Sequence, residues 1–167
     1  MRRLAILLLA VLLALPAVAQ NLAGTWSISE TMDEKQDDMD SSMIMTADMK
    51  LAEDGSCFQS GEAYMTMGKD DMDLHFRIVF SVSGSWTREG NILTIRNNPK
   101  SAKIDVVDNN LPGVLKVLLV NTVKKELKKE LTSKKPDVYA IISLTESELV
   151  LLEQGVKNPQ PETYKRK

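Results

Sequence analysis

Between residues 39 and 86 the chain alternates between apolar and polar positions with a period of two. In "MDSSMIMTADMKL" (39–51) four methionines, an alanine and a leucine occupy odd positions, and most even positions are polar. In residues 57–67 most odd positions are also apolar, although Phe58 and Tyr64 fall on the polar face, whereas in residues 72–86 the even positions are apolar. Successive side chains of a strand point to opposite faces, so this pattern predicts three long strands, each with one apolar face.

Shorter runs of the same kind predict five more strands. Asp54 and Gly55 separate the first two long strands and are typical of a tight hairpin turn. The acidic run at residues 32–40 has no periodicity and is interpreted as a loop. The polar tail from residue 157 is interpreted as irregular, with 163–166 as a candidate last edge strand. The eight predicted strands are residues 23–31, 39–51, 57–67, 72–86, 92–96, 102–107, 137–145 and 148–154.

Residues 111–135 follow a helical rather than an extended pattern. Asn110 is a candidate N-cap, Pro112 suits the first turn, and Pro136 ends the segment. We expect its apolar stripe to pack on the sheet or close the barrel, with the lysines in solvent. The alternative is a transient contact of this basic amphipathic helix with an anionic membrane surface. The stripe consists of Leu115, Leu118, Leu119, Val123, Leu127 and Leu131.

The strand lengths and short turns predict an all-β fold. We expect an eight-stranded antiparallel up-and-down barrel with one amphipathic α-helix inserted before the last two strands. The strand at residues 72–86 exceeds the usual length of about five or six residues, which favours a barrel or a strongly coiled sheet. An open sheet packed on the helix is the alternative.

The first nineteen residues have the pattern of a secretory signal peptide. Two arginines precede an apolar run shorter than the roughly 20 residues that a membrane span requires, and small residues precede Gln20. We therefore expect cleavage after Ala19 and a periplasmic or secreted chain that forms one domain over residues 20–167. Cys57 is the only cysteine, which excludes an internal disulfide.

Charge is distributed unevenly, although the net charge is only −2. Residues 30–73 hold thirteen acidic side chains and three lysines, whereas residues 111–135 hold seven lysines and two glutamates. A nucleic-acid-binding protein normally carries a basic stripe with interleaved aromatic residues, so we expect no nucleic-acid partner.

Two glycine–tryptophan motifs resemble those of bacterial lipocalin-like domains. They are "GTW" in the first predicted strand and "SGSWTREGNILTI" at the end of the longest one, and the resemblance covers residues 22–154 in pattern. It implies a calycin-type barrel in which the first tryptophan closes the floor, and structural roles for Gly24, Trp26, Gly84 and Trp86. The chain departs from the family because its helix precedes the last two strands and the usual disulfide is absent.

The apolar faces of the long strands are predicted to point into the barrel. An eight-stranded barrel is either filled by side chains or holds one small ligand, and flexible, polarizable methionines suit an apolar guest. We therefore predict a non-enzymatic protein that binds a small apolar molecule in its lumen. The predicted lumen residues are Met43, Met45, Met49, Met65, Met67, Leu74, Phe76, Ile78 and Phe80.

Three alternatives accompany this prediction. In the first, the methionines are ordinary core residues that fill the barrel. The protein then acts through its surface, as an interaction or inhibitor module. In the second, the pairs Met43/Met45 and Met65/Met67 bind copper, because thioethers are soft ligands that select Cu(I). The third, an enzyme, is disfavoured.

The residues that usually carry catalysis are scarce. His75, the only histidine, is expected on the outward face of its strand without an orienting partner. Cys57 shares the methionine face and is expected to be a buried, inert thiol. One histidine and one cysteine exclude the usual zinc sites, and the acidic run lacks the spacing and glycine of a calcium loop. No catalytic residue, metal or cofactor is predicted.

Overall fold

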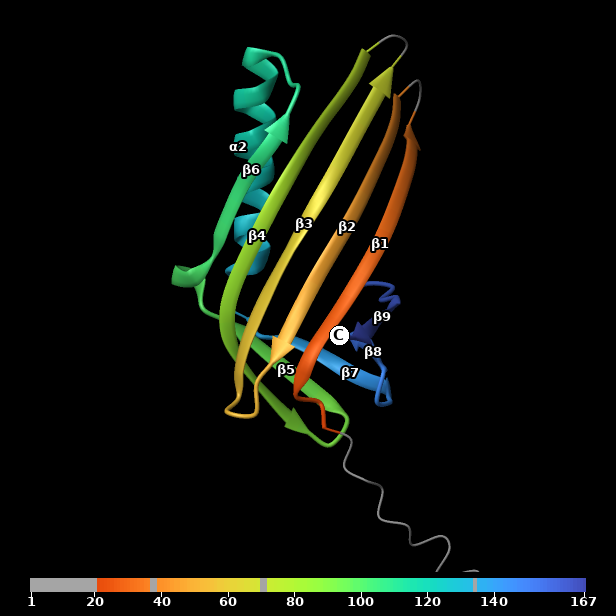
Figure 1. Ribbon diagram of the computed structural model, residues 1–167, viewed down its shortest axis with the longest axis vertical. Coiled ribbons are helices and arrows are strands. Elements are labelled where there is room, and N and C mark those ends of the chain that lie inside the picture. Colours follow the sequence, from red (N-terminus) through yellow and green to blue (C-terminus); the bar gives the residue numbers. More distant parts are fainter. Residues whose placement is uncertain (1–20, 37–38, 70–71, 134) are drawn as a thin grey trace, which may run out of the picture.

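Eight strands form a closed antiparallel barrel, as the sequence predicts (Figure 1). The computed structural model describes residues 21–36, 39–69, 72–133 and 135–167. The ring runs β1, β2, β3, β4, β5, β7, β8, β9 and back to β1. The elements are β1 (Gly24–Gln36), β2 (Met39–Leu51), β3 (Ser56–Lys69), β4 (Met72–Glu89), β5 (Ile92–Asn97), the 3-10 turn η1 (Pro99–Ser101), β6 (Lys103–Asn109), α2 (Gly113–Leu131), β7 (Asp137–Leu144), β8 (Glu148–Glu153) and β9 (Pro161–Arg166).

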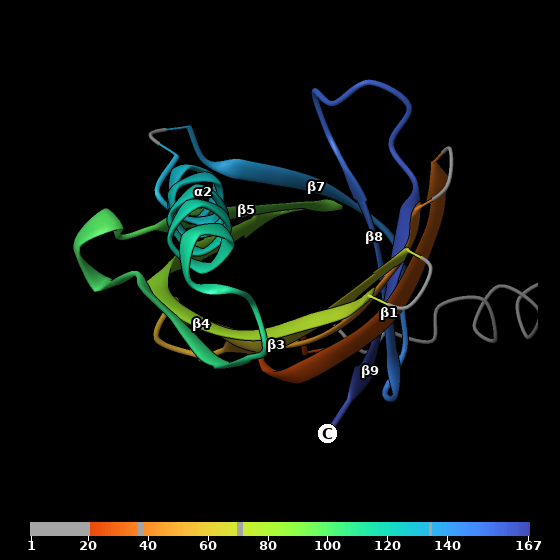
Figure 2. The same ribbon diagram turned by 90° about the horizontal axis from the view of Figure 1, so that it is seen from above.

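The four long strands β1 to β4 extend beyond the closed part of the barrel. β1 pairs with β2 along its whole length, but with β9 only at Trp26 and Ser27. One edge of β4 pairs with β3. Its other edge pairs with β5 through residues 84–89 and with β6 through residues 76–81. The upper sheet is therefore a curved wall, with β6 as a ninth strand outside the ring (Figures 1 and 2).

Helix α2 lies on the concave side of this wall (Figure 2). It begins directly after Pro112, and the Thr132 N–H donates to the Lys128 carbonyl at its end. Its Val120, Val123 and Leu127 pack on a cluster of buried side chains. The cluster consists of Phe76 and Ile78 of β4 and Leu111, which precedes the helix. Leu118 of the predicted stripe is instead 61% exposed. Within the described ranges, no helix combines the length and hydrophobicity needed to cross a membrane.

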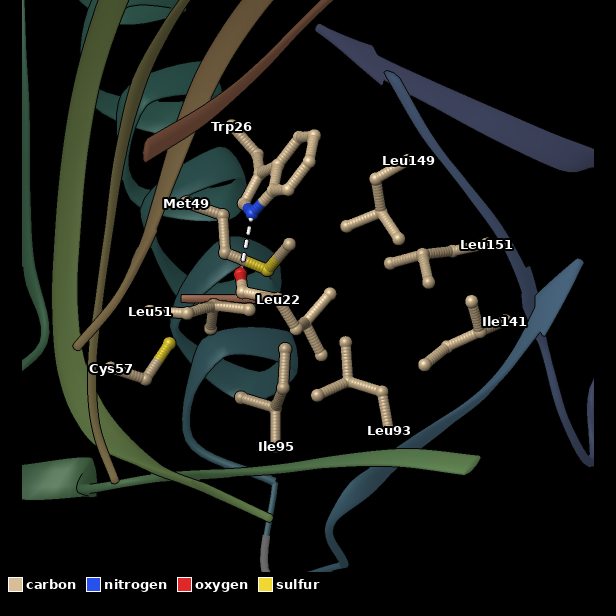
Figure 3. Packing of buried hydrophobic residues seen from close by; sticks show 10 residues of the cluster. All are labelled: Leu22, Trp26, Met49, Leu51, Cys57, Leu93, Ile95, Ile141, Leu149 and Leu151. Carbon is tan, nitrogen blue, oxygen red and sulfur yellow. Dashed lines mark hydrogen bonds between the residues drawn. The ribbon is translucent and has the colours of Figure 1, made fainter. Parts of the chain in front are cut away.

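The main hydrophobic core fills the closed end of the barrel (Figure 3). Buried side chains from β1, β2, β3, β5, β7 and β8 meet there with Leu22, which precedes the first strand. The Trp26 indole N–H donates to the Leu22 carbonyl at 2.8 Å, and the Trp86 indole N–H donates to the Ala52 carbonyl at 2.9 Å. Each indole thus combines core packing with a backbone hydrogen bond, which satisfies its one polar group.

The predicted acidic loop at residues 32–40 is mostly strand. Residues 32–36 continue β1 and residues 39–40 begin β2, while Asp37 and Asp38 lie outside the described residues. The ladder runs in unbroken register from Gly24 opposite Leu51 to Gln36 opposite Met39. Pairing with the strongly alternating β2 therefore extends a segment whose own sequence shows no strand pattern.

Three further predictions differ from the structure. The tail, interpreted as irregular with 163–166 as a candidate edge strand, forms β9 from Pro161 to Arg166 and closes the ring between β8 and β1, whereas the predicted strand 102–107 lies outside the ring as β6. β4 is long enough for two successive partners on one edge, a choice that no local pattern encodes. Asn110 does not begin the helix; its side-chain oxygen accepts the His75 backbone N–H at 2.7 Å.

Candidate functional site

The predicted lumen residues do lie on one face of β2, β3 and β4, but most of them are packed. Met49 is buried in the main core. Phe76 and Ile78 are buried under α2, where they form a second cluster with Leu111. The partly buried side chains that surround this cluster include Met65, Met67 and Leu74 from β3 and β4, and Ile104 and Val106 from β6.

A different part of the inner face stays open, along β1 and β2. Met43 and Met45 of β2 are half-buried there, and register places Met45 opposite Glu30 of β1. Phe80 of β4 is half-buried on the same inner face. Met32 points to the same side and is 46% exposed. We call Glu30, Met32, Met43, Met45 and Phe80 the inner surface. Because α2 covers β3, β4 and β6 rather than β1, solvent reaches this surface from the side of β1.

A layer of acidic and phenolic side chains faces the same interior from β7, β8 and β9. Register places Glu162 beside buried Leu151, and Tyr164 beside buried Leu149. The Tyr164 hydroxyl donates to a Glu162 carboxylate oxygen at 2.7 Å. Asp137, Glu153 and Tyr139 extend the layer, since they are paired with inward-facing neighbours.

Burial sets the protonation behaviour of this layer. It raises the pKa of the Glu162 carboxyl, and the nearby charges of Glu30 and Glu153 raise it further against the hydrogen bond from Tyr164. Burial, together with Glu153, also raises the pKa of Asp137. The pKa values of the two phenols are raised for the same reasons, so Tyr139 and Tyr164 stay neutral donors. Carboxylates in this position can accept hydrogen bonds from a polar end of a guest.

Arg166 of β9 covers the ring of Trp26. Its guanidinium lies 4.4 Å from the centre of the Trp26 ring, and it donates to the carbonyls of Asn21 and Ala23. A side chain at Gly24 would meet this guanidinium at 3.1 Å, and the φ of Gly24 is +152°. The glycine of the "GTW" motif thus leaves room for the Arg166 guanidinium, and its positive φ favours glycine at this position.

A hollow of about 860 Å³ lies on the outer face of the sheet, and Phe80 is the only predicted lumen residue among those that line it. Outward side chains of β1 to β4 and β9 surround it, and most of them are serine, threonine or charged residues. The Asp48 carboxylate lies at the hollow and accepts two hydrogen bonds, from the Ser27 hydroxyl at 2.5 Å and from the Lys167 ammonium at 2.7 Å. These two bonds, with Lys167 the larger cause, lower the pKa of Asp48. Ile28, Ala47, Val79 and Phe80 also contribute to its lining, which exposes more apolar than polar area.

The two residues considered for catalysis lie apart from each other. His75 faces outward, with its Nε2 atom 3.8 Å from a carboxylate oxygen of Asp108 and its ring 5.9 Å from that of Tyr64. Cys57 is buried in the main core, and burial raises the pKa of its thiol to about 12, which agrees with the prediction of an inert thiol. In the part of the chain that the structure describes, no three His, Cys, Asp or Glu side chains gather as a metal site.

Sequence reasoning missed Met32 and the interior carboxylates. Met32 was hidden in the run interpreted as a loop, although Trp26, Ile28, Glu30 and Met32 continue one even-numbered face of β1. In the tail, the alternation of Glu162, Tyr164 and Arg166 is a similar signal, obscured by nearby prolines and charges. Inward-facing charges break the apolar alternation by which strands are recognised.

Comparisons with known proteins identify no family for this chain. No protein-family model matches the chain, and no curated protein sequence matches it. Among solved structures, an uncharacterized protein from Bacteroides eggerthii DSM 20697 is similar over 88% of this chain and 100% of its own, with 13% identity and a TM-score of 0.39. The fold is therefore described from this chain itself, as a closed eight-stranded antiparallel barrel with one helix between β6 and β7.

Proposed function

We propose that this protein is an exported, lipocalin-like binding protein that holds a small apolar molecule against the inner surface of its barrel. The observation that carries the proposal is the incomplete filling of the inner face. Met43, Met45 and Phe80 point inward but stay half-buried, and Met32 is 46% exposed. A guest that covers these side chains removes apolar surface from water, which is the usual source of affinity in such sites.

The interior carboxylates give the proposed guest an orientation. The apolar part of the molecule lies on the methionines of β1 and β2, and a hydrogen-bond donor on it faces Glu162 and Glu30. Methionine is flexible and polarizable, so the surface adapts to guests of different shape. No step of this function needs a nucleophile or a general base, and we propose no catalytic role.

The test uses two neighbouring positions of β2 that point to opposite faces. Met45 faces inward opposite Glu30, whereas Ile44 faces outward opposite Tyr64 and is 46% exposed. We expect the wild-type protein to bind N-phenyl-1-naphthylamine, a neutral apolar dye, with saturable fluorescence enhancement. Met45→Lys abolishes this enhancement because it places an ammonium on the inner surface, and Ile44→Lys retains it.

Circular dichroism and thermal unfolding establish that both variants fold. Retention of dye binding by folded Met45→Lys contradicts the proposed site. Loss of binding in Ile44→Lys alone moves the site to the outer face.

The surface-acting alternative has its own support on the outer face. Ile44, Phe58 and Tyr64 are 46%, 44% and 38% exposed, and the outer hollow lies over neighbouring strands. An interaction or inhibitor module would use these residues. The same pair of variants separates the two functions, since only Ile44→Lys alters this face.

Helix α2 supports the proposed contact with a membrane surface. Val114, Val117 and Leu118 are 77%, 60% and 61% exposed, and lysines at 116 and 125 are exposed on the same helix. An apolar face flanked by lysines is suited to anionic lipid headgroups. Such a contact would bring the open side of the barrel near a source of apolar guests.

A further inference from the structure

Three methionines lie side by side in one row across β1, β2 and β3. Register places Met32 opposite Met43, and Met43 opposite Met65. The row continues to Phe76 of β4, which is buried, so all three methionines belong to the inner face. Side chains directly opposite one another on paired strands have Cβ atoms about 4.5–5.5 Å apart, a span that methionine side chains cross easily. The sulfur atoms of Met32, Met43 and Met65 can therefore approach one another on the inner face of β2.

Two more methionines flank this row. Met45 and Met67 are two residues along from Met43 and Met65 on the same faces, which makes them diagonal neighbours within reach of long side chains. Five of the nine methionines of the chain thus lie in one patch. The ten buried residues of the main core include only one, Met49, and rely on leucine and isoleucine instead. Packing alone does not explain why methionines are concentrated in this patch while the main core uses leucine and isoleucine.

The row is anchored at one end and open at the other. Met65 packs on the cluster under α2, which fixes its position, whereas Met32 is 46% exposed and gives access from solvent. Glu30 lies two residues before Met32 on the same face, opposite Met45. Its carboxylate adds negative potential beside the thioethers, which attracts a cation to this place.

We propose that Met32, Met43 and Met65 form a binding site for a soft monovalent cation, Cu(I) or Ag(I). Thioethers are soft, uncharged ligands that prefer such ions to harder divalent metals. The site is distinct from the proposed apolar guest site in its chemistry, although Met32 and Met43 belong to both. It also differs from the methionine pairs suggested by sequence, because it joins three strands and includes Met32.

A thioether site makes a specific prediction about pH. Methionine has no proton to lose on binding a metal, so the thioethers do not compete with protons for Ag(I), and only the nearby carboxylates of Glu30 and Glu162 add a pH dependence. A site built on the Cys57 thiol would gain affinity steeply as pH rises, because the pKa of this buried thiol is about 12.

The experiment is a calorimetric titration of the protein, purified from cells that express the full chain, with silver nitrate in chloride-free buffer. We expect one Ag(I) per chain, and a loss of affinity of more than about tenfold in each of Met32→Leu, Met43→Leu and Met65→Leu. Leucine conserves volume, so these variants keep the fold. Met49→Leu is the matched control, since it removes a buried thioether of the main core, and it should bind as the wild type does.

Two further variants make the result decisive. Cys57→Ala should bind Ag(I) normally, and loss of binding in it would assign the metal to the thiol and overturn the proposal. Unchanged affinity in Met43→Leu, or no saturable binding by the wild type, would also overturn it. Met65→Leu should still bind the neutral dye, because Met65 packs on the cluster under α2 and is not part of the inner surface, so failure of the metal site and failure of the guest site are distinguishable.

Discussion

Glu162 illustrates at the scale of one residue how burial shapes the interior of this barrel. Its carboxyl faces the lumen beside Tyr164 and near Glu30, and its pKa is raised above the ordinary value of 4.5. The unfolded chain ionises this group more readily than the folded protein does. Above the raised pKa, the buried charge therefore lowers the free energy of unfolding, and this cost disappears as the pH falls through the raised pKa.

Glu162→Gln tests this effect. The amide never ionises, and its oxygen still accepts the hydrogen bond from Tyr164. We expect the variant to be more stable than the wild type at a pH well above the raised pKa, with the difference shrinking as the pH falls through that pKa. Urea unfolding at a series of pH values, followed by tryptophan fluorescence, measures the difference. Glu146→Gln in the exposed turn after β7 should show no such trend, and a pH-independent gain in Glu162→Gln would refute the assignment.

At the scale of elements, Gly84 marks the point where β4 begins its pairing with β5. It lies opposite Asn97, and a Cβ atom built on it would approach the Arg96 carbonyl oxygen to 2.4 Å. The backbone of β5 cannot move aside for a side chain at residue 84 as the end of a flexible side chain could. The close approach of the two strands therefore depends on the missing side chain rather than on an unusual φ.

Gly84→Ala should therefore destabilise the barrel. We expect it to lower the free energy of unfolding by about 1–3 kcal/mol, since the two strands must separate to admit the methyl group. Chemical denaturation monitored by circular dichroism measures the loss. Gly113→Ala is the control, because nothing lies within 4 Å of its added Cβ at the start of α2, and it should be neutral or stabilising by up to about 1 kcal/mol. Equal stability of both variants would show that β4 and β5 tolerate a side chain at residue 84.

Strands whose apolar alternation is complete were predictable as elements, and strands with inward charges were not. The period of two gives β2 with its bounds and most of β3 and β4. β1 was predicted to end near Thr31 because Glu30 and the following acidic residues mask its continuation. The tail strand β9 was offered only as an edge, because its role depends on distant partners in β1 and β8.

For the whole molecule, the barrel class follows from strand length and hairpin order, but the filling of its interior does not. No sequence pattern indicates that α2 covers Phe76, Ile78, Met65 and Met67 and leaves the side of β1 open. The same limit applies to the candidate site, because Met32 and Glu162 gain their places only through pairing across strands. Methionine periodicity located the right face of the sheet, and tertiary packing selected which part of that face is accessible.

The most direct test of the proposed function is native mass spectrometry of the protein purified without denaturant or detergent from its native source, with Cys57 kept reduced. The proposal predicts one organic molecule bound per chain, retained in Ile44→Lys and lost in folded Met45→Lys. The mass of the adduct would then identify the class of guest. A bare polypeptide mass for the wild type, or an adduct that survives Met45→Lys, would contradict binding at the inner surface and favour a protein that acts through its outer face.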